Sequence, residues 1–182
     1  MKLNILFAVL AIAFFTSCKK SNGEKTKLLT SPSESFFPLQ IGNYWRINDQ
    51  NYSEVKDTLT IKGELYYQVS SLTGGDAFGE NYYRINQDQE LISTSPRYPD
   101  YRYTHAKFNA NLGDTFQTLG DKSVNDYKVT VVEKTDTRMT FSFDMIYHPN
   151  LKGHPHTVTY LKGLGWDDRW KTICIDGKII SK

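Results

Sequence analysis

Residues 139–145 of the chain read MTFSFDM, and this stretch decides the fold class. Met139, Phe141, Phe143 and Met145 are apolar, and the three residues between them are polar. An apolar period of two is typical of a strand with one buried face, because successive side chains point to opposite sides of a sheet. The stretch therefore predicts a half-buried β-strand.

The same period recurs before this stretch. Residues 127–131 alternate apolar and polar side chains, and the polar segment 133–137 between the two runs is typical of a hairpin turn. Residues 59–61 and 65–69 alternate on either side of a turn at 62–64, with Leu59, Ile61, Leu65, Tyr67 and Val69 as the apolar members. These patterns predict further antiparallel strands.

A hairpin is also predicted at the C-terminus. Asp176-Gly177 lies between the apolar runs 173–175 and 178–180, and such a pair favours a type I′ turn, in which both central residues have positive φ. No stretch past residue 30 has the pattern of an amphipathic helix of three turns. We expect an all-β fold, an antiparallel sheet sandwich or partly open barrel of roughly nine to eleven strands.

The N-terminal residues 1–18, MKLNILFAVLAIAFFTSC, have the pattern of a bacterial lipoprotein signal. About eleven apolar residues follow Lys2, which suits a signal peptide and is too short for a membrane-spanning helix. Phe15-Thr16-Ser17-Cys18 resembles the lipobox, whose Cys receives the lipid. Cys18 is therefore the expected lipid attachment site, and three acyl chains would anchor the protein to a membrane.

Three segments are expected from this reading: a signal peptide over 1–17, the lipidated Cys and a flexible tether over 18–35, and a single β domain over 36–182. The segment 19–35 is polar and poor in apolar residues, which favours a tether. Lys19 stands where an Asp would retain an enterobacterial lipoprotein in the inner membrane. We therefore expect a lipid-anchored protein of the outer membrane that faces the periplasm, with the cell surface as the alternative.

Composition excludes some functions. Lys plus Arg number 22 and Asp plus Glu 20, and a net charge of +2 is too weak a field to favour nucleic acid as a partner. The chain has two cysteines. Because the lipid would occupy Cys18, no disulfide within the chain is expected, and Cys174 in an apolar run is predicted to be a small buried residue.

Residues 36–47, FFPLQIGNYWRI, resemble the FPLxxGNxW opening of a family of uncharacterised bacterial lipoproteins that is abundant in Bacteroidota. Two later stretches are also similar to this family: 112–116, LGDTF, where the family more often has Trp in place of Phe116, and 163–166, GLGW. The resemblance implies an antiparallel β fold and a lipid anchor, and it implies no known activity. From the residues themselves, Trp45 is predicted to fill the core.

A cluster of aromatic and basic residues is the first candidate site. Residues 96–105, PRYPDYRYTH, bring together Arg97, Tyr98, Tyr101, Arg102 and Tyr103. Tyr and Arg are favoured at binding surfaces, and Tyr rings stack on sugars and peptides. The alternative is that the tyrosines only cover the sheet while both arginines stay solvated.

A second candidate is the histidine group His148, His154 and His156. A pair at i and i+2 on a strand shares one face and can begin a metal site, but zinc or copper needs three or four ligands, and the flanking Pro and Gly favour a loop. Asp167 and Asp168 are adjacent carboxylates that strand geometry would direct to opposite faces. A solvated turn is the preferred interpretation of that pair.

No motif of nucleophilic, zinc or phosphate chemistry occurs in the sequence, and no cofactor is expected. The predicted function is that of a membrane-anchored, non-catalytic envelope lipoprotein whose β domain binds another envelope component, protein or glycan. The alternative is a hydrolase or metal-binding protein that uses His148, His154 and His156 with Asp167 or Asp168.

Overall fold

The computed structural model describes residues 34–182 of the chain. The expected signal peptide, Cys18 and residues 19–33 of the expected tether lie outside the described residues. Within 34–182 the chain forms two antiparallel sheets and no α-helix, so the all-β expectation is confirmed. No helix in this part of the chain is long and apolar enough to cross a membrane.

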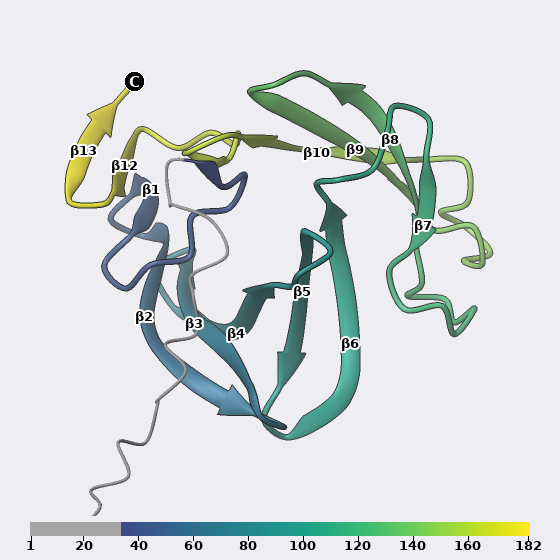
Figure 1. Cartoon of the computed structure of the whole chain (residues 1–182), viewed down its shortest axis with the longest axis horizontal. Coiled ribbons are helices and arrows are strands. Elements are labelled where there is room, and N and C mark those ends of the chain that lie inside the picture. The colour runs from purple at the N-terminus through teal and green to yellow at the C-terminus, as the bar shows by residue number, and fades with distance from the viewer. Residues whose placement is uncertain (1–33) are drawn as a thin grey trace, which may run out of the picture.

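The larger sheet has eight strands. In the order in which they lie side by side these are β13 (Lys178–Ser181), β12 (Thr172–Ile175), β1 (Tyr44–Asn48), β2 (Asn51–Ile61), β3 (Glu64–Thr73), β4 (Ala77–Ile85), β5 (Glu90–Ser95) and β6 (Tyr98–Lys107). The smaller sheet has five strands, in the order β11 (Gly165–Trp166), β10 (His156–Leu161), β9 (Arg138–Asp144), β8 (Lys128–Lys134) and β7 (Thr115–Gln117). Figure 1 shows the larger sheet curving like a cup from β13 to β6, with the smaller sheet across its top.

The strand count exceeds the nine to eleven expected. β7 and β11 have three and two residues, which is too short for an apolar period to show in the sequence. The strand predicted over 139–145 is β9, and its residues Met139, Phe141 and Phe143 are almost completely buried. Val129 and Val131 of β8 face the same core, which confirms the hairpin predicted around 133–137.

Phe37 is central to the core between the sheets. Its fully buried ring stacks on Trp45 at 5.3 Å between centroids and meets the edges of Tyr160 and Trp166. Trp45 is 4% exposed, as predicted, and its indole N–H donates to the carbonyl of Leu164 at 2.6 Å. The opening motif thus joins the two sheets through aromatic packing.

Two of the predicted turns have the backbone conformation that their residues favour. Lys62 and Gly63, between β2 and β3, have φ of 50° and 80°. Asp176 and Gly177, between β12 and β13, have φ of 52° and 72°. Both central residues are in the left-handed region, which confirms the hairpins.

Three predictions of burial are wrong. Leu65, on the core face, is 42% exposed because the far end of the β2–β3 hairpin extends past the area that the smaller sheet covers. Leu59 is 39% exposed because the register shift between Val55 and Asp57 places it on the opposite face, paired with Tyr66. Tyr66 is buried instead, in a small cluster with Ile61 and Ile92 on the opposite face of the larger sheet. Cys174 is only partly buried, since its neighbours in β12 point to the core and alternation directs its thiol the other way.

Candidate functional site

A cleft of about 410 Å³ opens between the larger and the smaller sheet. Aromatic and uncharged polar side chains from both sheets line it: Asn81, Ser93, Tyr101, Tyr103, His105, Tyr127, Phe143, His156, Val158, Tyr160 and Trp166. We call this the aromatic cleft. Concave sites that combine apolar walls with a few polar groups are the usual form of ligand-binding sites.

Strand β6 forms one wall of the aromatic cleft. Tyr101, Tyr103 and His105 occupy alternate positions of this strand, so all three side chains reach the same face of the sheet. Between Tyr98 and Tyr103 four residues of β6 lie opposite Thr94 of β5 alone, which makes a large bulge. The buried Thr94 hydroxyl donates to the carbonyl of Tyr101 at 2.7 Å and so supports the bulge.

His105 is held rigidly at the inner end of this wall. Its Nε2 is 2.8 Å from the Ser93 hydroxyl, and its ring packs against Tyr83 and Tyr103. Burial lowers the pKa of His105 to about 4, so the imidazole is neutral near pH 7. Burial also raises the pKa of Tyr103 to about 12, which keeps its hydroxyl protonated.

The smaller sheet provides the facing wall. His156, the first residue of β10, stacks on Phe143 of β9 with ring centroids 5.3 Å apart, and the edge of Tyr127 meets it at 5.6 Å. Trp166 of β11 lies at the inner end and packs on Phe37 in the core. The core thereby fixes one wall of the cleft.

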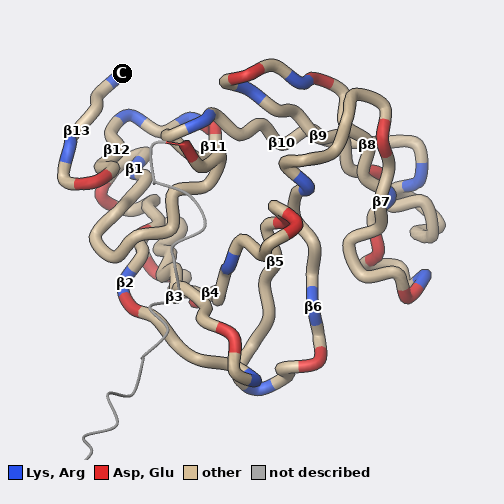
Figure 2. Tube along the Cα trace, viewed as in Figure 1, with Lys and Arg blue, Asp and Glu red and all other residues tan. Residues whose placement is uncertain are grey.

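The lining formed by the described residues contains no carboxylate, ammonium or guanidinium group. Among the described residues that line the aromatic cleft there is no Asp, Glu, Lys or Arg, while Figure 2 shows charges of both signs spread over the rest of the trace. Neutral hydroxyl, carboxamide and imidazole groups can each donate or accept hydrogen bonds. The site therefore suits an uncharged ligand with polar groups and apolar faces.

The five predicted binding residues separate in the structure. Tyr101 and Tyr103 line the aromatic cleft, as the binding hypothesis requires. Tyr98 is 60% exposed at the start of β6 with the Arg97 guanidinium 5.6 Å from its ring centroid, and neither residue lines the cleft. Arg102 lies on the opposite face of the sheet, because it alternates with Tyr101 and Tyr103.

On that opposite face Arg102 belongs to a charged group. Its guanidinium bonds the Glu64 carboxylate at 2.6 Å, and Arg84 contacts the same carboxylate. The hydrogen bond from Arg84 lowers the pKa of Glu64 most, and the Coulomb attraction of both arginines adds to it. This charged group covers the small cluster of Tyr66 and presents polar atoms to solvent on that face.

The histidine group does not converge. Nδ1 of His148 accepts the backbone N–H of Asn150 at 3.1 Å and of Leu151 at 3.2 Å, which makes it the cap of a turn. His154 is exposed and precedes β10, in a loop as the flanking Pro and Gly favour, so it does not share a strand face with His156. His156 alone reaches the aromatic cleft.

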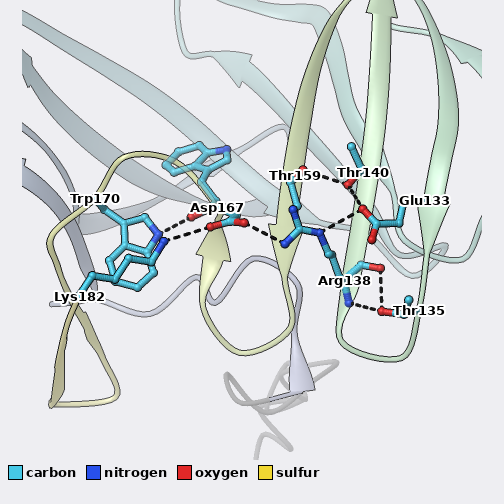
Figure 3. Close-up of polar contacts among 9 residues, drawn as sticks. Glu133, Thr135, Arg138, Thr140, Thr159, Asp167, Trp170 and Lys182 are labelled. Carbon is cyan, nitrogen blue, oxygen red and sulfur yellow. Dashed lines mark hydrogen bonds and ion pairs between the residues drawn. The ribbon is translucent and has the colours of Figure 1, made fainter.

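The two aspartates serve in the structure as charge partners. Figure 3 shows Asp167 between Arg138 of β9 and the C-terminal Lys182, at 3.0 Å and 3.2 Å. Asp168 is exposed and accepts the backbone N–H of Arg169 at 2.7 Å. Within residues 34–182 no three His, Cys, Asp or Glu side chains are grouped so that they could hold a metal ion.

Several lining residues were not predicted from the sequence. Asn81, Ser93, Tyr127 and Trp166 come from four other segments, and only the paired sheets bring them together. His105 carried a usable signal, since it continues the alternation of Tyr101 and Tyr103.

No protein-family model, curated protein or solved structure gives a significant match to the chain.

Proposed function

We propose that the chain is a lipid-anchored lipoprotein of the bacterial envelope whose aromatic cleft binds an uncharged part of another envelope component, without catalysis. The resemblance of residues 36–47 to the FPLxxGNxW lipoproteins and the lipobox at Cys18 support the anchor. The outer membrane, with the domain facing the periplasm, is the proposed location.

One observation carries the binding role. Tyr101, Tyr103 and Tyr127 present aromatic rings in a cleft whose lining, within residues 34–182, has no Asp, Glu, Lys or Arg and also contains His105, Asn81 and Ser93. Aromatic rings supply contact area at a low entropic cost, and the neutral polar groups supply directional hydrogen bonds. A glycan or an uncharged stretch of a protein fits this chemistry.

Binding can be tested with two matched tyrosines of one strand. Tyr101 and Tyr98 are 50% and 60% exposed, so neither change to Ala removes a core side chain. Only Tyr101 lines the cleft. We expect the full chain, purified in detergent, to bind neutral glycans or uncharged peptides on an array. Tyr101→Ala should weaken this binding about tenfold, which is a loss of about 1.4 kcal/mol, and Tyr98→Ala should leave it unchanged. Equal binding by both variants, or no binding to any probe, contradicts the proposal.

The anchor has its own test. Cys18→Ser replaces the thiol that would form the thioether to the lipid. We expect the wild-type chain to incorporate a palmitate analogue and to sediment with membranes, and the Ser variant to do neither. A Ser variant that is still labelled and still sediments would disprove the lipoprotein assignment.

A further inference from the structure

A second cleft, of about 290 Å³, lies on the same face of the larger sheet. Its lining is again aromatic and polar, and it comprises Trp45, Ile47, Asn51, Tyr52, Ser53, Leu72, Thr73, Trp166, Asp168, Arg169 and Trp170. The only charged members are Asp168 and Arg169, whose side chains are 64% and 89% exposed and pair with each other at 3.7 Å. The chemistry of the second cleft is thus close to that of the aromatic cleft.

Trp166 belongs to both linings. It stands on β11 at the edge of the smaller sheet, and its ring packs at 5.3 Å against Trp45 and at 4.4 Å against Phe37. The aromatic cleft extends from Trp166 toward β6, and the second cleft extends toward β1 and β2. The two clefts are therefore neighbours along one face.

A strip of small, uncharged residues connects them across the sheet. Ser53 of the second cleft pairs with Ser71 of β3, and Ser71 pairs with Gly79 of β4. Residues directly opposite one another in a ladder share a face, and Gly79 is two positions from Asn81 of the aromatic cleft, which places it on the same face by alternation. The ladder from Ser53 through Ser71 and the alternation toward Asn81 both place Gly79 between the clefts.

Gly79 leaves open space at this point. A Cβ added to it would meet no heavy atom within 4 Å, and its φ lies outside the left-handed region. A side chain could thus be placed there without backbone strain. The absence of one leaves the strip between the clefts unobstructed.

We infer that the two clefts are the ends of one groove, which runs past Trp166 and over Gly79 and binds a linear, uncharged oligosaccharide. This inference rests on the proposed function and extends it to a ligand class. From β2 to β5 the groove crosses three strand intervals, or about 14 Å. A ligand that fills both clefts must therefore be a chain of several sugar units.

The groove favours a glycan over a peptide. A peptide that binds a sheet by strand addition needs an exposed edge, whereas the strip between the two clefts lies on β2, β3 and β4, which are each paired on both sides. Its polar groups are mainly hydroxyls and carboxamides, from Ser53, Thr73, Asn81 and Ser93, which donate and accept as sugar hydroxyls do. The aromatic rings at both ends provide stacking surfaces.

The test is a length series on the full chain, with linear neutral glucan, mannan and chitin oligosaccharides of two to six units as probes. We expect affinity to rise about tenfold or more from the dimer to the hexamer. Gly79→Leu should remove this gain while dimer binding stays unchanged, because it fills the strip and leaves both clefts intact. Glu80→Leu is the matched control, since it places the same side chain on the opposite face.

The outcomes separate the two proposals. Dimers that bind as tightly as hexamers, or hexamers that bind equally to wild type and Gly79→Leu, would refute the continuous groove and leave the cleft proposal standing. Tighter binding of an anionic glycan or of a proline-rich decapeptide than of every neutral oligosaccharide would refute the ligand class. No binding of any probe would overturn the inference and the proposed function together.

Discussion

At the scale of single residues, contacts around the opening motif explain why the GLGW stretch has a glycine at position 165. Gly165 has φ of 87°, and a Cβ added there would lie 2.8 Å from the Trp45 ring. The indole cannot withdraw, because it donates to Leu164 and stacks on Phe37. Any side chain at this position therefore requires the core to shift.

Gly165→Ala tests this contact against a control with the same backbone angle. Gly113 also has φ of 87°, but a Cβ there meets nothing within 4 Å. Both variants incur the strain of a non-glycine residue at positive φ, of about 1–3 kcal/mol. We expect Gly165→Ala to lower the free energy of unfolding by about 1–3 kcal/mol more than Gly113→Ala, because of overpacking. Denaturant unfolding measures the loss of unfolding free energy in both variants. Equal losses would show that the Trp45 ring can shift without destabilising the protein.

At the scale of elements, the sequence predicted strands well wherever alternation ran over five or more residues, as in β8 and β9. It failed where burial depends on what covers a strand. Leu65 has the alternation of a core residue, yet it lies beyond the smaller sheet and is exposed. Periodicity gives the face of a side chain, and only the packing of the second sheet decides whether that face is buried.

The candidate site follows the same rule. Tyr101 and Tyr103 were predicted together with Arg97, Tyr98 and Arg102 because all five are close in sequence. The strand separates them: alternation directs Arg102 to the opposite face, and the bulge supported by Thr94 places Tyr98 apart from the cleft. A bulge of this size has no local sequence signal, and the partners from β4, β5 and β10 are joined only by the tertiary fold.

The β12–β13 hairpin provides a prediction at this scale. Asp176 has φ of 52°, which Asn and Asp adopt readily and β-branched residues do not. Asp176→Val should destabilise the protein by about 1–3 kcal/mol, whereas Asp176→Asn should be close to neutral. Thermal or denaturant unfolding compares the two. If Val is tolerated as well as Asn, the turn does not need its type I′ conformation.

At the scale of the whole molecule, ionic contacts join segments that are distant in the chain. Arg138 bonds Glu133 at 3.1 Å and Asp167 at 3.0 Å, and Lys182 bonds the other oxygen of Asp167 while its ammonium lies 4.1 Å from the centre of the Trp170 ring (Figure 3). The C-terminal residue is thereby connected to the smaller sheet. These carboxylates are engaged with cations, which is consistent with a structural role for them.

In the upper part of the acidic pH range, His105 dominates the pH dependence of the free energy of unfolding. Its pKa falls from 6.5 to about 4 on folding because burial disfavours the charged ring. Between these values the unfolded chain binds more protons than the folded one, so the free energy of unfolding falls as pH is lowered from about 6.5 to about 4.

Carboxylates act below that range. The Arg84 hydrogen bond lowers the pKa of Glu64, and in Asp126 burial opposes ionisation but the backbone N–H donors of Leu119 and Lys122 outweigh it. The stabilisation from these two carboxylates is complete above their unfolded pKa values of 4.5 and 3.8, and it is lost as pH falls through their lower folded pKa values.

His105→Gln should therefore flatten the curve of unfolding free energy against pH between pH 6.5 and 4 and leave the steep loss of stability at lower pH in place. The exposed His154→Gln is the control, and denaturant unfolding across this pH range is the measurement. An unchanged slope in His105→Gln would mean that His105 titrates in the folded protein as it does in the unfolded chain.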